Sequence, residues 1–356
     1  MIGSARFQNL KALKDVSITF ESRLTILVGP NGSGKTTVLR ALNWLCQMTH
    51  ENMYDGEADK MQFGQLKTWH GGGTDAVVIE FQEVGSQSNG VRGIYSPPPG
   101  NIRKAQWFSP DGKTTSPKSD SVSQKNRPSE QSSELIDFYS HILAAPSKTT
   151  SMPPIFGEEG DGLASLMAYF KLYDEAKFDQ IQELFCSLIR QVKRIRIGRV
   201  QNENAGAFGE ELLFDLADRK GVPASAMSDG TLYALGLIAK ILDPQRPRVL
   251  FIDDIEHGFH PRAQLRLVEM LKKLLDEIPD LQIIATTHSP FILDKLEWNE
   301  VRVSGVRDDG SVEILPITDH PEIGRWKEDM TPGEFWATFF ENWVTQPKLK
   351  PEPQTV

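Results

Sequence analysis

Short apolar runs separated by polar or glycine-rich turns dominate the beginning of the chain. Phe7 to Leu10 and the alternating segment Val16 to Phe20 predict half-buried strands, and the continuous apolar run Leu24 to Val28 predicts a fully buried one. Immediately afterwards, apolar residues recur at helical spacing over about 34–48. The pattern therefore predicts strand, glycine-rich loop and helix in direct succession.

Similar elements follow in the rest of the chain. Ala76 to Val84 predicts a strand that pairs with Val91 to Tyr95, and residues 161–193 carry helical periodicity. A helix over Leu232 to Leu242 then precedes two buried strands, Arg248 to Ile252 and Leu281 to Ala285. Apolar strands that alternate with helices indicate an α/β fold with a parallel sheet.

Residues 96–133 differ from their surroundings. Prolines lie among Ser, Lys, Asp and Gln, and apolar periodicity is slight. Such a composition buries too little surface to offset the cost of ordering the chain, so we expect a long loop or a partly disordered insertion. Its slight excess of basic residues fits either a solvated loop or a binding arm.

The loop after the third predicted strand fits the phosphate-binding pattern G-x-x-x-x-G-K-[ST] at every fixed position. It reads Gly29-Pro30-Asn31-Gly32-Ser33-Gly34-Lys35-Thr36-Thr37. The backbone N–H groups of residues 31–37 are expected to surround a nucleoside triphosphate. Lys35 would contact the β- and γ-phosphates, and the Thr36 hydroxyl would bind Mg²⁺.

Two further predicted strands are followed by residues that suit catalysis or metal binding. The strand over 248–252 ends in Asp253 and Asp254, which suit a Mg²⁺ ligand and a group that polarises the attacking water, respectively. The strand over 281–285 leads to His288, a candidate contact to the γ-phosphate because parallel sheets place their sites at this edge. Between them, Ser228 and Gly230 open a helix whose start suits an anion.

Taken in order, the segments GPNGSGKTT, SDGT, FIDDIEHGFHP and TTHSP resemble the ABC-type ATPase heads of the SMC/RecF/OLD group, most closely its compact stand-alone AAA-family members. The resemblance implies a P-loop NTPase head with a β-rich lobe and a helical lobe. It also implies a homodimer that encloses two ATP molecules. Ser228 and Gly230 would then face the partner's nucleotide, Asp253 would be the Walker B acid, and His288 the switch histidine.

One departure from the family pattern bears on catalysis. Where the family usually has Glu, this chain has Asp254, with Glu256 two residues on. Because Asp is one methylene shorter, we expect either slow hydrolysis or transfer of the catalytic role to Glu256.

The resemblance covers residues 1–50 and about 205–300, and it implies one head over 1–356. Its expected parts are a nucleotide-binding core (1–50 and 205–325), a β-rich lobe (51–160), a helical lobe (161–200) and a C-terminal extension (326–356).

Bulk composition limits the function classes. The net charge of −9 argues against coating nucleic acid by overall charge, although Arg190, Lys193, Arg194, Arg196 and Arg199 form a local basic run. The two cysteines lie in apolar helical patterns and indicate core thiols of a reducing compartment. The longest apolar run, 232–242, contains Lys240 and is too short for a membrane span, so we expect a cytoplasmic protein.

Three functions remain open. The first is an ATPase whose dimerisation controls an effector protein, a nuclease or toxin encoded nearby, in bacterial anti-phage defence. The alternative is a RecF-like repair ATPase that binds duplex DNA through the basic run. A transporter subunit is disfavoured because the block at 228–231 lacks Gly-Gly-Gln, and the lack of long heptad runs excludes a long-armed SMC protein.

Overall fold

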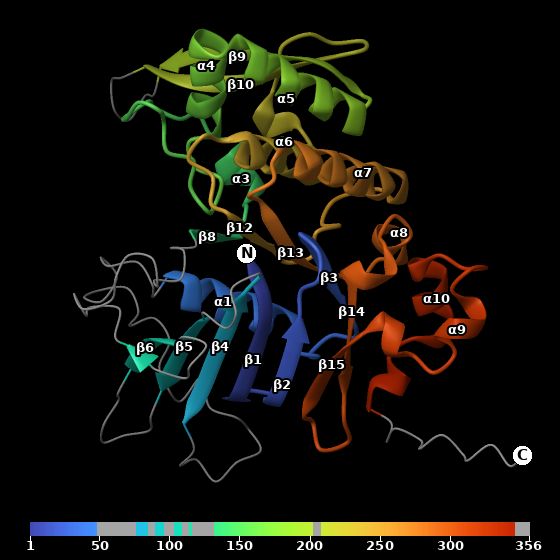
Figure 1. Ribbon diagram of the computed structural model, residues 1–356. Coiled ribbons are helices and arrows are strands. Elements are labelled where there is room, and N and C mark those ends of the chain that lie inside the picture. Colours follow the sequence, from blue (N-terminus) through green and yellow to red (C-terminus); the bar gives the residue numbers. More distant parts are fainter. Residues whose placement is uncertain are drawn as a thin grey trace, which may run out of the picture. The chain divides into compact units, whose positions relative to one another are not determined.

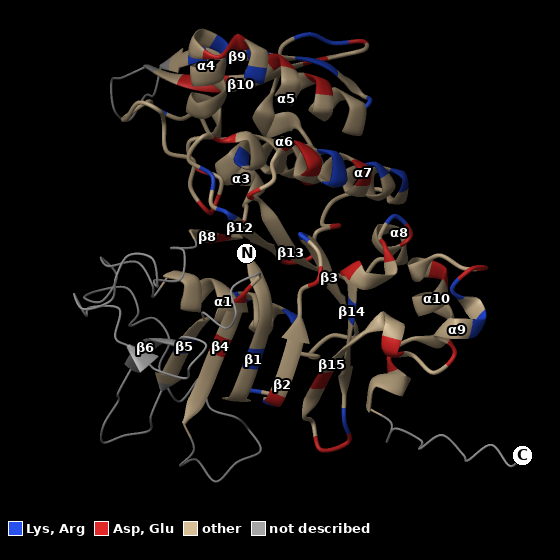
Figure 2. Ribbon diagram, viewed as in Figure 1, with Lys and Arg blue, Asp and Glu red and all other residues tan. Residues whose placement is uncertain are grey.

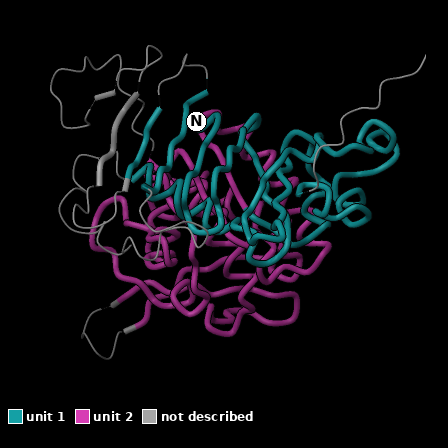
Figure 3. The backbone as a smooth tube through the Cα atoms, turned by 90° about the horizontal axis from the view of Figure 1, so that it is seen from below, with its two compact units in different colours: residues 1–131, 286–356 teal, residues 132–285 magenta. Residues whose placement is uncertain are grey.

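The structure is a computed structural model, and it describes residues 1–47, 76–84, 90–95, 103–108, 114–115, 132–201 and 208–345. The chain divides into two compact units (Figure 3). Unit 1 consists of Met1–Gln131 together with Thr286–Val356, and unit 2 consists of Ser132–Ala285.

Unit 1 contains an antiparallel sheet in the order β2-β1-β4-β5-β6-β7 (Figure 1). Its strands are β1 (Ile2–Leu10), β2 (Leu13–Thr19), β4 (Val77–Glu83), β5 (Gly90–Tyr95), β6 (Arg103–Phe108) and β7 (Thr114–Thr115). Alternate residues of β4, beginning with Val77, are buried, as expected for a sheet with one covered face. Helix α1 (Lys35–Gln47) packs on β5, where a Cβ atom at Gly93 would lie 3.1 Å from Leu45.

A second group of strands in unit 1 supports the glycine-rich loop. All five residues of β3 (Leu24–Val28) are buried, and β3 pairs in parallel with β14 (Val301–Val306). Strand β15 (Val312–Pro316) pairs antiparallel with β14. The glycine-rich loop therefore leaves a strand held on one side by β14.

The end of unit 1 is a small helical region. It comprises α8 (Pro290–Leu293), η4 (Trp298–Glu300), η5 (Ile317–Asp319), α9 (Ile323–Trp326), α10 (Pro332–Phe339) and η6 (Asn342–Thr345). The buried His320 ring lies 4.9 Å from the Phe335 ring centroid, 4.8 Å from that of Phe339 and 5.0 Å from that of Trp343. These rings give the residues after β15 an apolar centre of their own.

Unit 2 is built on parallel strands. Strand β12 (Val249–Ile252) pairs in parallel with β8 (Ser133–Ile136) and with β13 (Gln282–Thr287), whose last two residues are assigned to unit 1. Every residue of β12 and β13 is buried, and neither strand carries a charged side chain (Figure 2). Continuous apolar sequence is typical of parallel strands covered on both faces.

Helices and a three-stranded antiparallel sheet complete unit 2. The sheet has the order β11-β10-β9. The elements are α3 (Ser140–Leu143), α4 (Leu163–Tyr173), α5 (Glu175–Leu188), β9 (Val192–Gln201), β10 (Phe208–Leu216), β11 (Val222–Pro223), η3 (Ala224–Ala226), α6 (Asp229–Leu242) and α7 (Pro261–Glu277). Every residue of α6 from Gly230 to Leu242 is buried, whereas α7 keeps its charged residues on an exposed face.

The predicted strand–loop–helix order at 24–48 and the pairing of β4 with β5 are confirmed. The expectation of an irregular segment over 96–133 is wrong for 103–108 and 114–115, which form β6 and β7. Because β6 pairs with β5 over its whole length, sheet extension supplies the order that local apolar periodicity did not indicate. The rest of that segment up to 131, like 48–75, lies outside the described residues.

The charge that interrupts the apolar helix α6 has a structural role. Lys240 is 2% exposed, and its Nζ lies 2.7 Å from Oε1 of Glu134 on β8. The ammonium also donates to the Phe156 carbonyl and lies 4.5 Å from the Phe156 ring centroid. Burial raises the pKa of Glu134, and the Lys240 charge opposes that rise. The pair ties α6 to the strand beside β12.

We expect Lys240→Met to lower the free energy of unfolding by about 3–5 kcal/mol, because it leaves a buried carboxylate without its cation. The double variant Lys240→Met/Glu134→Leu should recover most of that loss. Urea unfolding followed by circular dichroism measures both. A single variant as stable as the wild type would show that the pair contributes nothing to the fold.

No helix in the described part of the chain is both long enough and apolar enough to cross a bilayer.

Candidate nucleotide-binding site

The phosphate loop lies in unit 1 between β3 and α1. Lys35 is 6% exposed, and its Nζ donates hydrogen bonds to the carbonyl oxygens of Gly29 and Pro30, each at 2.9 Å. The ammonium is thereby held across the start of the loop. Thr36 and Thr37 follow it in the first turn of α1 and are half-buried.

Strand β14 fixes the backbone of the phosphate loop. A Cβ atom at Gly29 would lie 2.3 Å from the Ser304 carbonyl oxygen, so only glycine fits there. The Ser304 hydroxyl donates to the Ser33 carbonyl on the other side of the loop. Sequence reasoning missed Ser304, since a serine in a strand carries no motif signal.

The loop suits a polyphosphate. Gly32 and Gly34 have φ angles of +79° and +80°, which favour glycine and let successive N–H groups converge. The buried Ser33 hydroxyl has no hydrogen-bond partner within the described residues, and a phosphate oxygen would supply one. These features fit a bound nucleotide by geometry as well as by motif.

In unit 2, the predicted acids follow the buried strand β12. Asp253 is half-buried, and Asp254 is exposed with φ of +47°, a left-handed conformation that Asp adopts more readily than most residues. Two turns follow, in which the His257 N–H donates to the Asp254 carbonyl at 2.8 Å and the Phe259 N–H to the Glu256 carbonyl at 2.9 Å. We call residues 253–259 the acid loop. It presents Asp254 and Glu256 on successive turns.

The helix start at Ser228 also lies in unit 2. Ser228 has the extended backbone of an N-cap, but its exposed hydroxyl bonds the Thr231 hydroxyl at 2.8 Å instead of a backbone N–H. Gly230 is buried, and a Cβ atom on it would lie 2.0 Å from the Gly258 carbonyl oxygen. Gly258 itself has φ of +74°. Glycine at 230 is therefore required within the chain, because α6 and the acid loop meet backbone to backbone.

His288 directly follows β13 and is exposed. The next residues begin α8: the Ser289 N–H donates to the Thr287 hydroxyl at 3.0 Å, and Pro290 takes the first helical position. Similarly, His260 caps α7 and Pro261 is at its first turn. The pairs His260-Pro261 and Ser289-Pro290 are thus helix starts.

The expected site residues divide between the units. Unit 1 holds Asn31–Thr37 and His288, and unit 2 holds Ser228, Gly230 and the acid loop. The expected Mg²⁺ ligands, Thr36 and Asp253, are therefore in different units, and their joint use is a proposal. Within the described ranges, no group of three or more His, Cys, Asp and Glu side chains is arranged to hold a metal ion.

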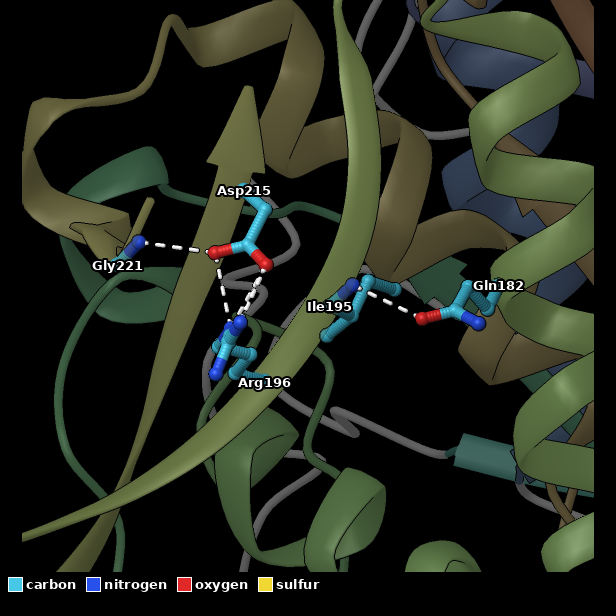
Figure 4. A network of polar contacts seen from close by, with 5 residues as sticks. All are labelled: Gln182, Ile195, Arg196, Asp215 and Gly221. Atoms are coloured by element: carbon cyan, nitrogen blue, oxygen red, sulfur yellow. Dashed lines mark hydrogen bonds and ion pairs between the residues drawn. The ribbon is translucent and has the colours of Figure 1, made fainter. Parts of the chain in front are cut away.

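The basic run lies around β9. Arg194 and Arg196 are exposed while Ile195 between them is buried, so the two arginines share the exposed face of the strand. Arg196, however, lies 2.8 Å from the Asp215 carboxylate on β10, and the Gly221 N–H donates to the same carboxylate at 3.0 Å (Figure 4). Although burial opposes it, the hydrogen bonds from Arg196 and Gly221 lower the pKa of Asp215. The Arg196 guanidinium is thus already paired with a carboxylate of the same chain.

Arg194→Ala and Arg196→Ala should separate the structural and the DNA-binding roles of β9. Because the pKa of Asp215 is lower in the folded protein than its ordinary value of 3.8, the ionised carboxylate stabilises the fold at pH values above 3.8. That stabilisation is lost as the pH falls through the lower pKa of the folded state. Arg196→Ala should therefore lower the melting temperature at pH 7, by an amount that shrinks toward pH 3, whereas Arg194→Ala should not.

If β9 contacts DNA phosphates, Arg194→Ala should reduce the salt dependence of duplex affinity by about one counterion. Identical salt slopes for this variant and the wild type would remove Arg194 from any DNA interface. Equal melting temperatures for both variants at pH 7 would contradict the role of Arg196.

Comparison with known proteins follows the same motifs. A family model described as "AAA domain, putative AbiEii toxin, Type IV TA system" matches residues 24–294, which contain every expected site residue. The Septu protein PtuA of Bacillus thuringiensis is 33% identical over 69 residues, which cover 19% of this chain and 17% of that protein. The phosphate import ATP-binding protein PstB 2 of Listeria monocytogenes is 46% identical over 52 residues, which cover 13% of this chain and 19% of that protein. The chain thus spans less than a fifth of either relative.

Solved structures share the fold at low sequence identity. An Smc head bound to the C-terminal winged-helix domain of ScpA has a TM-score of 0.57 at 15% identity, over 88% of this chain and 96% of that chain. An Smc head with an extended coiled coil, bound to the C-terminal domain of ScpA derived from Pyrococcus furiosus, also has a TM-score of 0.57, at 13% identity, over 92% and 99%. The fold is that of an SMC-type P-loop ATPase head. With its family model matched over more than half of its length, the chain belongs to the AAA-domain family described as including the putative AbiEii toxin of a type IV TA system.

Proposed function

We propose that this protein binds and hydrolyses Mg-ATP, that it dimerises around the nucleotide, and that dimerisation controls a partner effector in bacterial anti-phage defence. The phosphate loop is the single observation that carries the proposal. Its glycine contact with β14, its buried lysine and a Ser33 hydroxyl without a hydrogen-bond partner among the described residues support a polyphosphate site in a chain of an ATPase family.

The nucleotide would be held mainly by residues 31–37. Backbone N–H groups of the loop and the start of α1 would bind the phosphate oxygens, and Lys35 would exchange its carbonyl partners for the β- and γ-phosphates. The Thr36 hydroxyl and the Asp253 carboxylate are oxygen ligands of the type that Mg²⁺ prefers. Bound Mg²⁺ would neutralise charge on the phosphates.

Hydrolysis needs a group that orients and deprotonates water beside the γ-phosphate. Asp254 is our first candidate because it is exposed at the end of β12, and Glu256 is the alternative on the next turn. His288, exposed after β13, would contact the γ-phosphate and stabilise charge as it develops in the transition state.

Dimerisation would complete the site. Ser228 is exposed at the start of α6, a helix of 14 residues, so this residue is accessible to a partner's γ-phosphate at the positive end of the helix dipole. The close contact of Gly230 with Gly258 fixes the backbone at the start of α6. The buried Gly230 would therefore affect the nucleotide indirectly, by holding Ser228 in place.

The effector role rests on likeness to other proteins. PtuA is named as a Septu protein, and the Smc heads of similar fold were solved with bound domains of ScpA. Each of these two heads holds a separate protein partner, which supports a separate partner here, and the family description names a toxin of a type IV TA system, which fits a toxin-type effector. The match to PstB 2 is of comparable length, and we set transport aside because the block at 228–231 lacks Gly-Gly-Gln.

We expect Lys35→Ala to weaken ATP affinity or turnover at least tenfold, about 1.4 kcal/mol, because it removes a charge-assisted contact to the phosphates. Isothermal titration and phosphate release measure the two quantities. Lys14→Ala, at an exposed lysine of the same unit, is the matched control and should change neither. Wild-type behaviour of Lys35→Ala would refute nucleotide binding at this loop.

Asp254→Asn should abolish most turnover while ATP still binds, since the amide keeps the shape of the side chain but cannot accept a proton. Glu256→Gln should have the smaller effect. Single-turnover hydrolysis of both variants assigns the base. The reverse order of effects would transfer the catalytic role to Glu256.

A mixture of Lys35→Ala and Ser228→Arg chains should regain part of the wild-type activity that each lacks alone. In the mixed dimer, one site joins an intact phosphate loop to an intact Ser228, and the other site carries both defects. Ser228 is preferable to Gly230 for this test because substitution of Gly230 would also displace the acid loop.

Ser187→Arg, an exposed serine elsewhere in unit 2, is the control and should be active alone. Mixed dimers that form but remain inactive would argue against a site shared between two chains.

A further inference from the structure

Tyr233 carries a buried hydroxyl that the packing of unit 2 does not explain. It lies on α6 one turn after Gly230 and is 7% exposed. Its hydroxyl has no hydrogen-bond partner in the described part of the chain. Burial of an unsatisfied hydroxyl is destabilising, so native proteins that keep one usually have a functional reason.

The ring of Tyr233 is packed between the acid loop and the segment after β8. Its centroid lies 5.9 Å from that of Phe259 and 6.4 Å from that of His257, both in edge-on geometry. Phe138 makes a third edge-on contact at 5.9 Å. A phenylalanine would make all of these contacts, so packing accounts for the ring and not for the hydroxyl.

The surroundings of the hydroxyl are acidic. Burial and then the charges of Glu256, Asp253, Asp254 and Asp137 raise the pKa of Tyr233 well above its ordinary value. The group therefore remains protonated at physiological pH and can serve as a hydrogen-bond donor close to carboxylates. Among these acids, Glu256 acts on it most strongly.

The position of Tyr233 also connects two parts of the proposed site. Helix α6 begins with Ser228, touches the acid loop where Gly230 meets Gly258, and touches it again one turn later through the Tyr233 ring. The helix start and the acid loop therefore share one packed contact.

We propose that Tyr233 is a positioning residue for hydrolysis: its hydroxyl, which has no partner among the described residues, donates a hydrogen bond to the Glu256 carboxylate when Mg-ATP is bound and so orients the acid loop toward the attacking water. Because the Tyr233 ring packs on His257 and Phe259, the orientation of the acid loop also depends on the position of the start of α6. This inference rests on the proposed ATPase function.

Tyr233→Phe tests the proposal because it retains the ring and removes only the hydroxyl. We expect kcat for ATP to fall at least fivefold with KM within twofold of the wild type. Without nucleotide the melting temperature should not decrease, since the hydroxyl then has no partner among the described residues. Tyr169→Phe, which removes a half-buried hydroxyl from α4 in the same unit, is the control and should leave kcat unchanged.

A second readout separates positioning from general loosening. Hydrogen exchange of residues 253–260 should slow when Mg-ATP is added to the wild type, and this protection should be reduced in Tyr233→Phe at saturating ATP. Unchanged kcat and unchanged protection in an active Tyr233→Phe protein would overturn this inference and leave the proposed ATPase function intact. Absence of ATP turnover in the wild type would instead overturn the proposed function, and this inference with it.

Discussion

Close approach of one backbone segment to another is the constraint on which the rest of this structure depends. At Gly29 the phosphate loop touches the carbonyl of Ser304, and at Gly230 helix α6 touches the carbonyl of Gly258. Neither contact leaves room for a Cβ atom. In each unit, therefore, a glycine allows a strand or helix to pack directly on the backbone of a loop that carries charged or hydroxyl groups. Because backbone packing holds the loop, those side chains are not needed to stabilise the fold.

Charged side chains and buried hydroxyls then divide into those that support the fold and those that remain for chemistry. Lys240 meets Glu134 and the carbonyl of Phe156, so the cation within an apolar helix is satisfied by the fold itself. Arg196 is likewise occupied by Asp215. The hydroxyls of Ser33 and Tyr233, by contrast, have no hydrogen-bond partner among the residues described, and both lie in or beside loops that the motifs select.

Local patterns were sufficient where the chain forms its elements from neighbouring residues. The strand–loop–helix at 24–48, the buried strands at β12 and β13 and the helix after Ser228 all follow from short-range periodicity and turn residues. The spacing of Gly29–Thr37 also predicts a phosphate-binding loop; the structure confirms its place between strand and helix, and phosphate binding itself stays a prediction.

Features that depend on distant partners could not be predicted in this way. Glu134 and Lys240 are more than 100 residues apart, and Arg302 of β14 donates to the carbonyl of Thr19 across most of the chain. Strand β6 is ordered by pairing with β5 and not by its own composition. The reason for glycine at 230 lies in the acid loop, which no motif at 228–231 indicates.

The most direct test of the account is the mass of the Asp254→Asn protein in solution, measured by light scattering with Mg-ATP, with Mg-ADP and without nucleotide. One chain has a mass of 39.9 kDa. The account predicts about twice that mass with Mg-ATP and a single chain under the other two conditions. A mass that does not depend on the nucleotide would contradict ATP-driven dimerisation, the central claim made for this protein.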